Sequence, residues 1–249
     1  MAEEKEMTFW DHLDVLRGTL FRSAAAIFAV SIVFLCIKTS LFRFVLAPTT
    51  PDFFLYKLLG LDFSISLVNI DISAQFFVHL KIALLCGVIV AFPYVIFEIW
   101  KFIAPALYSN EKKAVRKAFG MASVLFYLGV AVGYTVILPV CLMFFMNYTV
   151  SDAVLNTITL NSYISMFVSM VFLIGLVFEF PTVIMVLSSL GIVNKTMLRS
   201  YRKHAFIVIM IIAALITPSD PVSMFVLGIP LYMLYEFSIY VSREAPAEE

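Results

Sequence analysis

The chain is poor in charge for its length. Of its 249 residues, 14% are charged and 62% are hydrophobic, whereas a soluble domain carries roughly 25% charged residues. The mean hydropathy is +1.00, and this composition excludes an ordinary soluble globular protein. The 17 basic and 17 acidic residues cancel, so the net charge gives no reason to expect nucleic acid as a partner.

The chain also lacks the residue patterns of enzyme active sites and metal centres. It has no phosphate-binding loop, no His/Cys metal-ligand spacing and no Ser-His-Asp arrangement with a local signature. Its cysteines, Cys36, Cys86 and Cys141, all fall inside apolar runs, and an odd count there argues against a disulfide framework. We therefore expect no enzyme activity, no metal and no cofactor, and any work must draw on a partner or on the membrane potential.

What the chain has in abundance is long apolar runs, and a helix needs ~20 such residues to cross the bilayer. We predict an all-α integral membrane protein with six transmembrane helices in a single domain, residues 1–249. The last two runs are separated only by Pro218-Ser-Asp-Pro221, which is a turn signal. The fifth and sixth helices are short, so we expect a concave bundle that leans on longer neighbours or thins the bilayer locally. The expected spans are about residues 20–42, 76–96, 119–146, 166–190, 204–217 and 222–240.

Lysine and arginine in the loops predict the orientation of these spans. Thirteen of them fall on the side that holds both termini, while the opposite side holds Lys38, Arg43 and Lys57. Both termini should therefore be cytoplasmic. The amino terminus is acidic and makes a poor secretory leader, so we expect the first apolar segment to be retained.

The longest outside connection, residues 43–75, has the composition of an ordered cap. Residues 53–59 could form a short interfacial helix, and residues 63–67 and 70–72 alternate as an extended segment would. Lys81, near the outer end of the second span, is expected to snorkel to the interface. Gly129 and Gly133 match the small-xxx-small pattern that allows close contact between membrane helices.

One carboxylate, Glu179, lies inside the fourth apolar run. An ionised side chain at mid-bilayer costs at least ~2.5 kcal/mol, so it usually faces a partner or water. Glu179 could pair with Tyr163, Ser165 or a bound water and fix helix packing. It could instead be a polar docking point in the concave face for partner helices, or it could hydrate the interior. A lone buried acid would also suit a proton-coupled transporter or channel for a small solute, which is the alternative function.

The loop between the second and third spans is the other candidate site. Glu111 follows Ser109-Asn110 and could simply stabilise the start of a helix. Glu98 and Lys101 are three residues apart and could form an ordinary surface pair. A rigid apolar frame surrounds Glu111, however, and favours a binding platform over a solvated loop. The frame consists of Trp100, Phe102, Pro105, Leu107 and Tyr108.

Ordered motifs along the whole chain resemble the TatC family, the large subunit of the twin-arginine protein translocase. The most specific block is Pro93…Trp100-x-Phe-Ile-x-Pro-Ala-Leu-Tyr-x-x-Glu111. The others are His12-Leu13…Leu16-Arg17, Ala47-Pro48, Phe126-Tyr127-x-Gly129 with Pro139, Phe178-Glu179-x-Pro181, Thr217-Pro218-x-Asp220 and Pro230…Tyr235-Glu236.

The resemblance implies a receptor for signal peptides with two consecutive arginines, in the bacterial cytoplasmic membrane. It implies assembly with single-span TatA/TatB-type subunits, self-association in a multimeric complex, and export of folded precursor proteins driven by the proton-motive force. Carried over by motif, Phe102, Leu107 and Glu111 would form the signal-binding surface, joined by Asp14 and Arg17. Carboxylates suit this role because they accept a guanidinium fork bidentately, whereas lysine offers only a point charge.

The chain departs from the family pattern at two of these sites. Where the amino-terminal signature usually has glutamate, this chain has Val15; Asp14 is adjacent but rotated by ~100° on a helix, and Asp11 or Asp14 could substitute. Met224 stands where a polar residue is common, on the side of the sixth helix where partner subunits are thought to dock. Structural or outside-loop roles are expected for Pro48, Pro93, Pro105 and Asp220.

Overall fold

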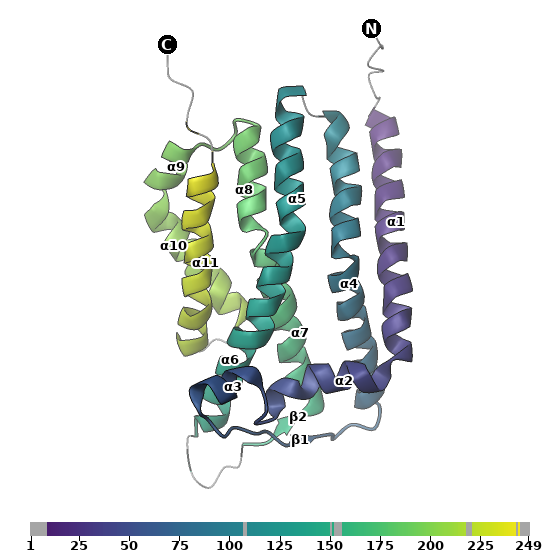
Figure 1. The fold of residues 1–249 in the computed structure, drawn as a ribbon, viewed down its shortest axis with the longest axis vertical. Helices are drawn as coiled ribbons and strands as arrows, with labels where there is room; N and C mark the ends of the chain where they lie inside the picture. The colour runs from purple at the N-terminus through teal and green to yellow at the C-terminus, as the bar shows by residue number, and fades with distance from the viewer. Residues whose placement is uncertain are drawn as a thin grey trace.

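The computed structural model describes residues 9–106, 109–149, 151, 156–217, 221–242 and 244, and it is almost entirely helical. Long helices run side by side as a bundle, and short elements cover one end of it (Figure 1). The long helices are α1 (Phe9–Cys36), α4 (Ala74–Ile103), α5 (Ser109–Val132), α6 (Leu138–Asn147), α7 (Leu160–Val177), α8 (Phe180–Ser189), α10 (Arg202–Ile216) and α11 (Pro221–Val241). These short elements are α2 (Lys38–Leu46), α3 (Phe54–Leu59), β1 (Leu67–Val68) and β2 (Ile158–Thr159), and a further short helix, α9 (Lys195–Ser200), lies at the other end (Figure 1).

Five helical stretches of the described chain are long and apolar enough to cross a membrane, which confirms the prediction of an all-α, multi-pass protein. They are His12–Cys36, Ala74–Ile103, Val115–Asn147, Leu160–Ser189 and Met224–Val241. The third stretch joins α5 to α6 through a π-helical segment, Gly133–Ile137. The remaining long helix, α10, has 15 residues, which span roughly 22 Å at 1.5 Å each. A sixth crossing helix therefore stays a prediction.

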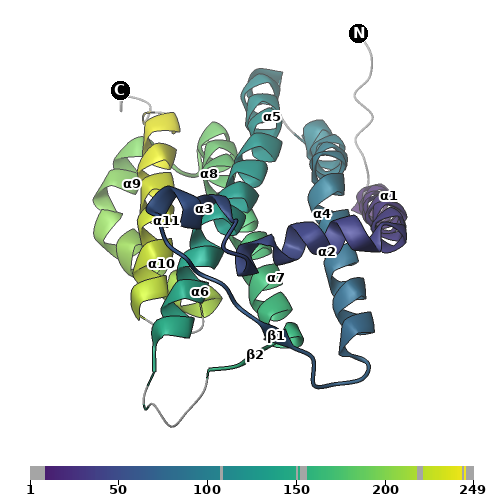
Figure 2. The same ribbon diagram turned by 60° about the horizontal axis from the view of Figure 1, so that its bottom comes forward.

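The first apolar run is divided between two helices. The sequence predicted a span to residue 42, but α1 ends at Cys36 and the chain turns at Ile37, where φ is −103° and ψ is 41°. After this turn α2 runs across the ends of the long helices (Figures 1 and 2). The start of α1 and the end of α11 lie at the other end of the bundle, on opposite sides of it (Figure 1). This arrangement agrees with termini on one side, and the assignment of that side to the cytoplasm stays a prediction.

The expected outer cap is ordered and includes the short helix α3. Two tyrosine hydroxyls of the bundle tie it down by donating to carbonyls at the end of α2, and a third, on α3, closes the cap on itself. Tyr134 donates to Phe44 at 2.8 Å, Tyr163 to Val45 at 2.6 Å, and Tyr56 to Pro48 at 2.8 Å. The last carbonyls of a helix lack an intrahelical donor, and the Tyr163 hydroxyl supplies one to Val45, whereas the Phe44 carbonyl also accepts from the Ala47 N–H. Strand β1 also pairs in parallel with β2, which joins the two outside connections.

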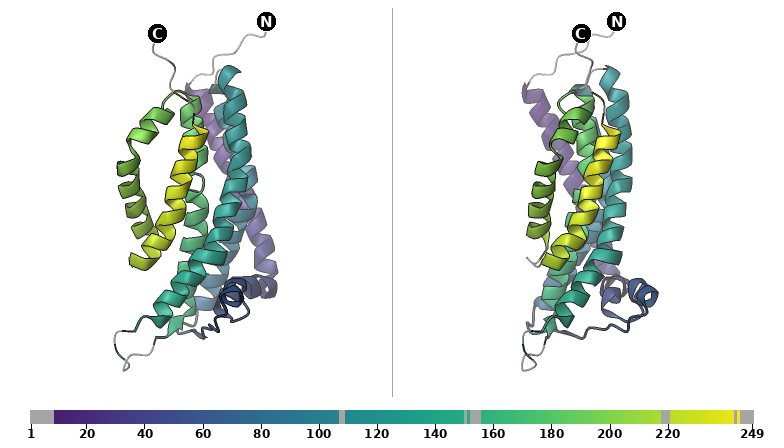
Figure 3. Two further views of the ribbon diagram at one scale, coloured as in Figure 1. Left: turned by 60° about the vertical axis from the view of Figure 1, so that its left-hand side comes forward. Right: turned by 90° about the vertical axis from the view of Figure 1, so that its left-hand side faces the viewer.

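Gly129 and Gly133 lie where α5 and its π-helical extension press against α7. A Cβ on Gly129 would lie 2.7 Å from the Phe178 side chain, and one on Gly133 would lie 3.1 Å from the Met170 carbonyl oxygen. Both distances are shorter than a side chain normally tolerates, so the predicted close helix contact is confirmed. The layer of helices is curved, because α1 and α10 lie on one side of the bundle and α5 on the other (Figure 3).

Candidate functional site

The first candidate surface lies where the amino-terminal turns of α1 meet the last turns of α4. The His12 ring stacks on the Phe102 ring with 4.3 Å between the centroids and 26° between the planes. Two segments that the sequence singled out separately, the amino-terminal signature and the loop platform, are therefore in direct contact. They meet at the end of the bundle that carries the start of α1 and the end of α11 (Figure 1).

The platform continues from α4 into α5. The Trp100 ring lies 5.4 Å from the Phe119 ring, and with Arg116 and Pro93 these residues line a cavity of about 270 Å³. Pro105 lies in a single helical turn, Ala104–Ala106, that ends α4. Leu107 and Tyr108 are outside the described residues.

Glu111 is the third residue of α5, and the structure describes its backbone alone. At this position a carboxylate also interacts favourably with the helix dipole. A role in stabilising the start of α5 and a role in binding a ligand both place the Glu111 carboxylate at this position. The structure is compatible with either role.

Asp14 and Arg17 are both exposed on the first turns of α1. Among the residues that the structure describes, neither takes part in an ion pair. The Asp14 carboxylate is therefore free to accept a cation from outside the chain. Val15 is also exposed, at 38%, and its apolar side chain can contribute packing but no charge.

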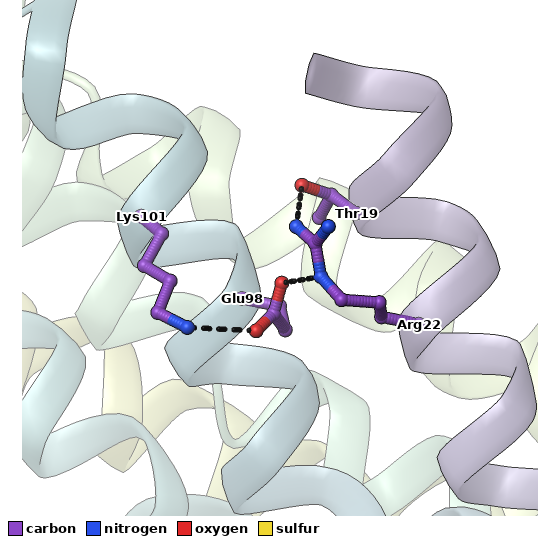
Figure 4. A network of polar contacts seen from close by, with 4 residues as sticks. All are labelled: Thr19, Arg22, Glu98 and Lys101. Carbon is purple, nitrogen blue, oxygen red and sulfur yellow. Dashed lines mark hydrogen bonds and ion pairs between the residues drawn. The ribbon is translucent and has the colours of Figure 1, made fainter. Parts of the chain in front are cut away.

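A buried ion cluster lies deeper along the same contact between α1 and α4 (Figure 4). Glu98 accepts from Arg22 Nε at 2.7 Å and from Lys101 Nζ at 3.0 Å. Arg22 also donates to Thr19 Oγ1 at 3.4 Å. The Glu98 side chain is 1% exposed, whereas those of Arg22 and Lys101 are 52% and 51% exposed.

The prediction that Glu98 and Lys101 form an ordinary surface pair was therefore wrong. Its error has a physical cause, because the third member, Arg22, lies 76 residues away in sequence. A local spacing rule sees only the pair that is three residues apart. Since Glu98 already has two cationic partners, it holds α1 on α4, and its carboxylate is occupied.

The second candidate site is Glu179, which lies at a break between α7 and α8. Pro181 follows near the start of α8 and has no N–H to continue the helical hydrogen bonds. Two partners suggested by the sequence are engaged elsewhere: Tyr163 donates to Val45, and Ser165 accepts from Lys81 at 3.2 Å. The predicted pairing of Glu179 with Tyr163 or Ser165 was therefore wrong. Lys81 is exposed and reaches α7 by this bond.

Glu179 has a buried oxygen without a hydrogen-bond partner. Within the described parts of the chain, Glu179 Oε1 and Thr182 Oγ1 are both buried and neither has a partner with good hydrogen-bond geometry, although the two groups lie close enough to interact with each other. Leaving a buried polar group unpaired costs roughly 1–3 kcal/mol, and more for a charged group. The pair is therefore suited to receive a donor from outside the chain, either water or a polar group of a partner.

The remaining predicted site residues fall in different places. Met224 is half-buried on α11 and packs against the apolar cluster that contains Leu227 and Ile174. Pro48 is buried in the outer cap, Pro93 lies inside α4, and Asp220 is outside the described residues. The structure thus brings together the α1 and α4 parts of the first site, and it places Glu179 on a separate part of the bundle.

Comparisons with known proteins agree with this architecture. Residues 11–230 match the family model of the Sec-independent protein translocase protein TatC. The TatC protein of Blattabacterium sp. subsp. Periplaneta americana is 35% identical, with 96% of each chain covered. TatC of Escherichia coli K12 is 30% identical, over 98% of this chain and 91% of that protein. A crystal structure of the twin arginine translocase receptor TatC superposes with a TM-score of 0.77 at 29% identity, covering 93% of this chain and 99% of that one.

Proposed function

The chain belongs to the TatC family of Sec-independent protein translocases, and from this premise we propose that it is the signal-peptide receptor of a twin-arginine translocase. It is a multi-pass membrane protein of the bacterial cytoplasmic membrane that serves protein transport. It organises a complex that exports folded proteins bearing twin-arginine signal peptides, driven by the proton-motive force. Its action is binding and assembly, without catalysis. The alternative of a small-solute transporter or channel has no support among its relatives.

The contact between His12 and Phe102 is the observation that carries the receptor proposal. It brings the amino-terminal turns of α1, which carry the exposed Asp14, against the platform that Glu111 follows a few residues later in the chain. Two guanidinium groups need two carboxylates on a stiff support. In this proposal Glu111 accepts one arginine. Asp14 accepts the other, because Val15 occupies the position where the family usually has a glutamate.

The remaining residues of the surface have supporting roles in this proposal. Phe102 and Leu107 contact the apolar part of the signal peptide. Arg17, exposed one turn beyond Asp14, belongs to the same signal-binding surface. Glu98 takes no arginine, because Arg22 and Lys101 already neutralise it.

Assembly would use the second site. We propose that the unpaired Glu179 oxygen and Thr182 hydroxyl receive a polar group from a single-span TatA/TatB-type subunit, and that the α11 surface around Met224 contacts the same helix. Pairing a polar group that is otherwise unsatisfied inside the membrane would stabilise that contact.

Crosslinking in membranes tests the receptor role. A photo-crosslinker at Lys112, next to Glu111, should capture a twin-arginine precursor and should not capture the same precursor with two lysines. Asp14→Asn should lower the yield, whereas Asp62→Asn, an exposed carboxylate of the outer connection, should leave it unchanged. Equal capture of the two precursors would contradict the proposal.

A further inference from the structure

A cavity of about 640 Å³ opens between α4 and α5, directly beside α2. Its walls are almost wholly apolar. They are built by α1, α2, α4, α5 and α7, with Leu41, Val45, Leu85, Val130 and Phe167 among the residues that line them. Large side chains at its mouth are exposed, including Phe44 at 56% and Val90 at 50%. The cavity is therefore open toward the surrounding membrane.

Helix α2 gives this cavity a polar rim. It lies across the ends of the long helices at the end of the bundle opposite the start of α1 (Figures 1 and 2). Its residues Leu41 and Val45 are buried toward the bundle, while Lys38 and Arg43 are exposed. A helix with this division lies in the plane of a membrane interface, with its basic side chains at the level of the lipid headgroups.

The two basic residues of α2 carry uncompensated charge. Helix α2 contains no acidic residue, and neither Lys38 nor Arg43 forms an ion pair with any residue that the structure describes. The next basic residue along the chain, Lys57, differs in this respect because it pairs with Asp52 at 3.0 Å. Two cations without an ion pair in the described chain therefore lie on the helix whose Ser40 and Phe44 line the cavity, and Arg43 directly precedes Phe44.

We propose that this cavity is a binding site for one phospholipid of the leaflet opposite the chain termini. An acyl chain occupies the apolar cavity, and the lipid phosphate lies on Arg43 and Lys38. Lipids with a net negative charge bind preferentially, because they have no cationic headgroup that offsets the phosphate charge or is repelled by Arg43 and Lys38. The proposal is independent of signal-peptide recognition, which takes place at the other end of the bundle.

The basic residues of α2 favour a lipid over a partner helix as the occupant, because a lipid supplies both a phosphate for Arg43 and Lys38 and hydrocarbon for the apolar cavity. A flexible hydrocarbon chain fits the same space without leaving polar backbone groups to be satisfied.

Photolabelling of the full-length chain in phosphatidylcholine nanodiscs tests the proposal. The probe is phosphatidylglycerol with a diazirine in the middle of one acyl chain, and the same probe with a choline headgroup is the comparison. Peptide mass spectrometry should place the label on the cavity wall, around Cys86 and Val130. Phosphatidylglycerol should label severalfold more strongly than phosphatidylcholine.

Two variants have matched controls. Ala131→Phe fills the cavity from its exposed rim and should abolish wall labelling, whereas Ala25→Phe, on an exposed part of α1, should not. Arg43→Gln should weaken labelling by phosphatidylglycerol about fivefold, which corresponds to ~1 kcal/mol for one basic residue near an anionic surface. Lys57→Gln should have no effect, because Lys57 is already paired.

The rate at which N-ethylmaleimide modifies the half-buried Cys86 thiol of the unaltered chain gives a second readout. Phosphatidylglycerol should slow this reaction. The measurement needs no variant, so it tests the proposal even if the Ala131→Phe protein fails to accumulate. Three results would overturn the proposal: label spread evenly over the membrane surface, wall labelling that persists in Ala131→Phe, or crosslinks from the wall to a second protein chain.

Discussion

Replacing Glu98 by glutamine removes the charge that holds α1 on α4 and should weaken both the fold and the signal-binding surface. The carboxylate accepts two charge-assisted hydrogen bonds, at 2.7 Å from Arg22 and 3.0 Å from Lys101. Such bonds contribute roughly 1.5–3 kcal/mol each when sheltered. Both cations are about half exposed (52% and 51%), so screening by water reduces this gain. We expect a net loss of about 1–2 kcal/mol.

A double-mutant cycle isolates the ion pair from other effects of the substitution. The cycle combines Arg22→Gln with Glu98→Gln in the purified chain and measures unfolding by heat or by SDS. We expect a coupling energy of about 1 kcal/mol, because the Glu98 side chain is 1% exposed. The control is the Lys57–Asp52 pair, whose side chains are 63% and 84% exposed and whose coupling should lie near the low end of the roughly 0.2–1 kcal/mol typical of exposed pairs.

The same variant also tests how the cluster acts on function. If Glu98 positions α1, Glu98→Gln should reduce precursor crosslinking at Lys112 without changing the preference for two arginines over two lysines. A coupling energy no larger than that of the Lys57–Asp52 control would refute the reasoning. Loss of the preference for arginine would refute it in a different way, because it would make Glu98 a ligand of the signal peptide.

Three further predictions concern orientation and the two proposed sites. Tags at both termini should be protected in intact cells, while Ser151→Cys should be labelled from outside; labelling of the termini would overturn the charge rule applied here. Glu111→Gln should weaken capture of a twin-arginine precursor about tenfold, since a charge-assisted bond contributes roughly 1.5–3 kcal/mol, and unchanged capture in membranes would refute the role. Glu179→Ala should still bind the signal peptide but fail in assembly or transport, with Glu179→Gln milder because an amide keeps hydrogen-bonding capacity; normal export by the alanine variant would leave Glu179 a packing residue.

Local patterns in the sequence predicted those features that depend on neighbouring residues. The spacing of Gly129 and Gly133 predicted a close helix contact, and the structure has it. The composition of residues 53–59 predicted a short helix in the outer connection, which is α3. In each case the signal lies within a few residues of the chain, although the glycine spacing does not identify the contacting residues of α7 and Phe178.

Features that join distant segments were beyond such reasoning. The Glu98 cluster needs Arg22 from another helix, and the tyrosine hydroxyls reach carbonyls up to 118 residues away. The end of α1 at Cys36 was missed because apolar residues continue through Leu41 and Phe42. The polar triplet Lys38-Thr-Ser was the available signal, since it interrupts the run where the chain turns into α2.

The distribution of satisfied and unsatisfied polar groups separates the fixed parts of this molecule from those that await a partner. Glu98 is buried with two cations, and the hydroxyls of Tyr56 and Tyr163 each have an acceptor, so these groups hold helices and cap in place. Asp14 is exposed without an ion-pair partner in the described chain, and Glu179 Oε1 is buried without a hydrogen bond there. Because an unpaired group gains most from a new contact, a peptide bound at Asp14 and a helix bound at Glu179 would each bind to a framework that is already rigid.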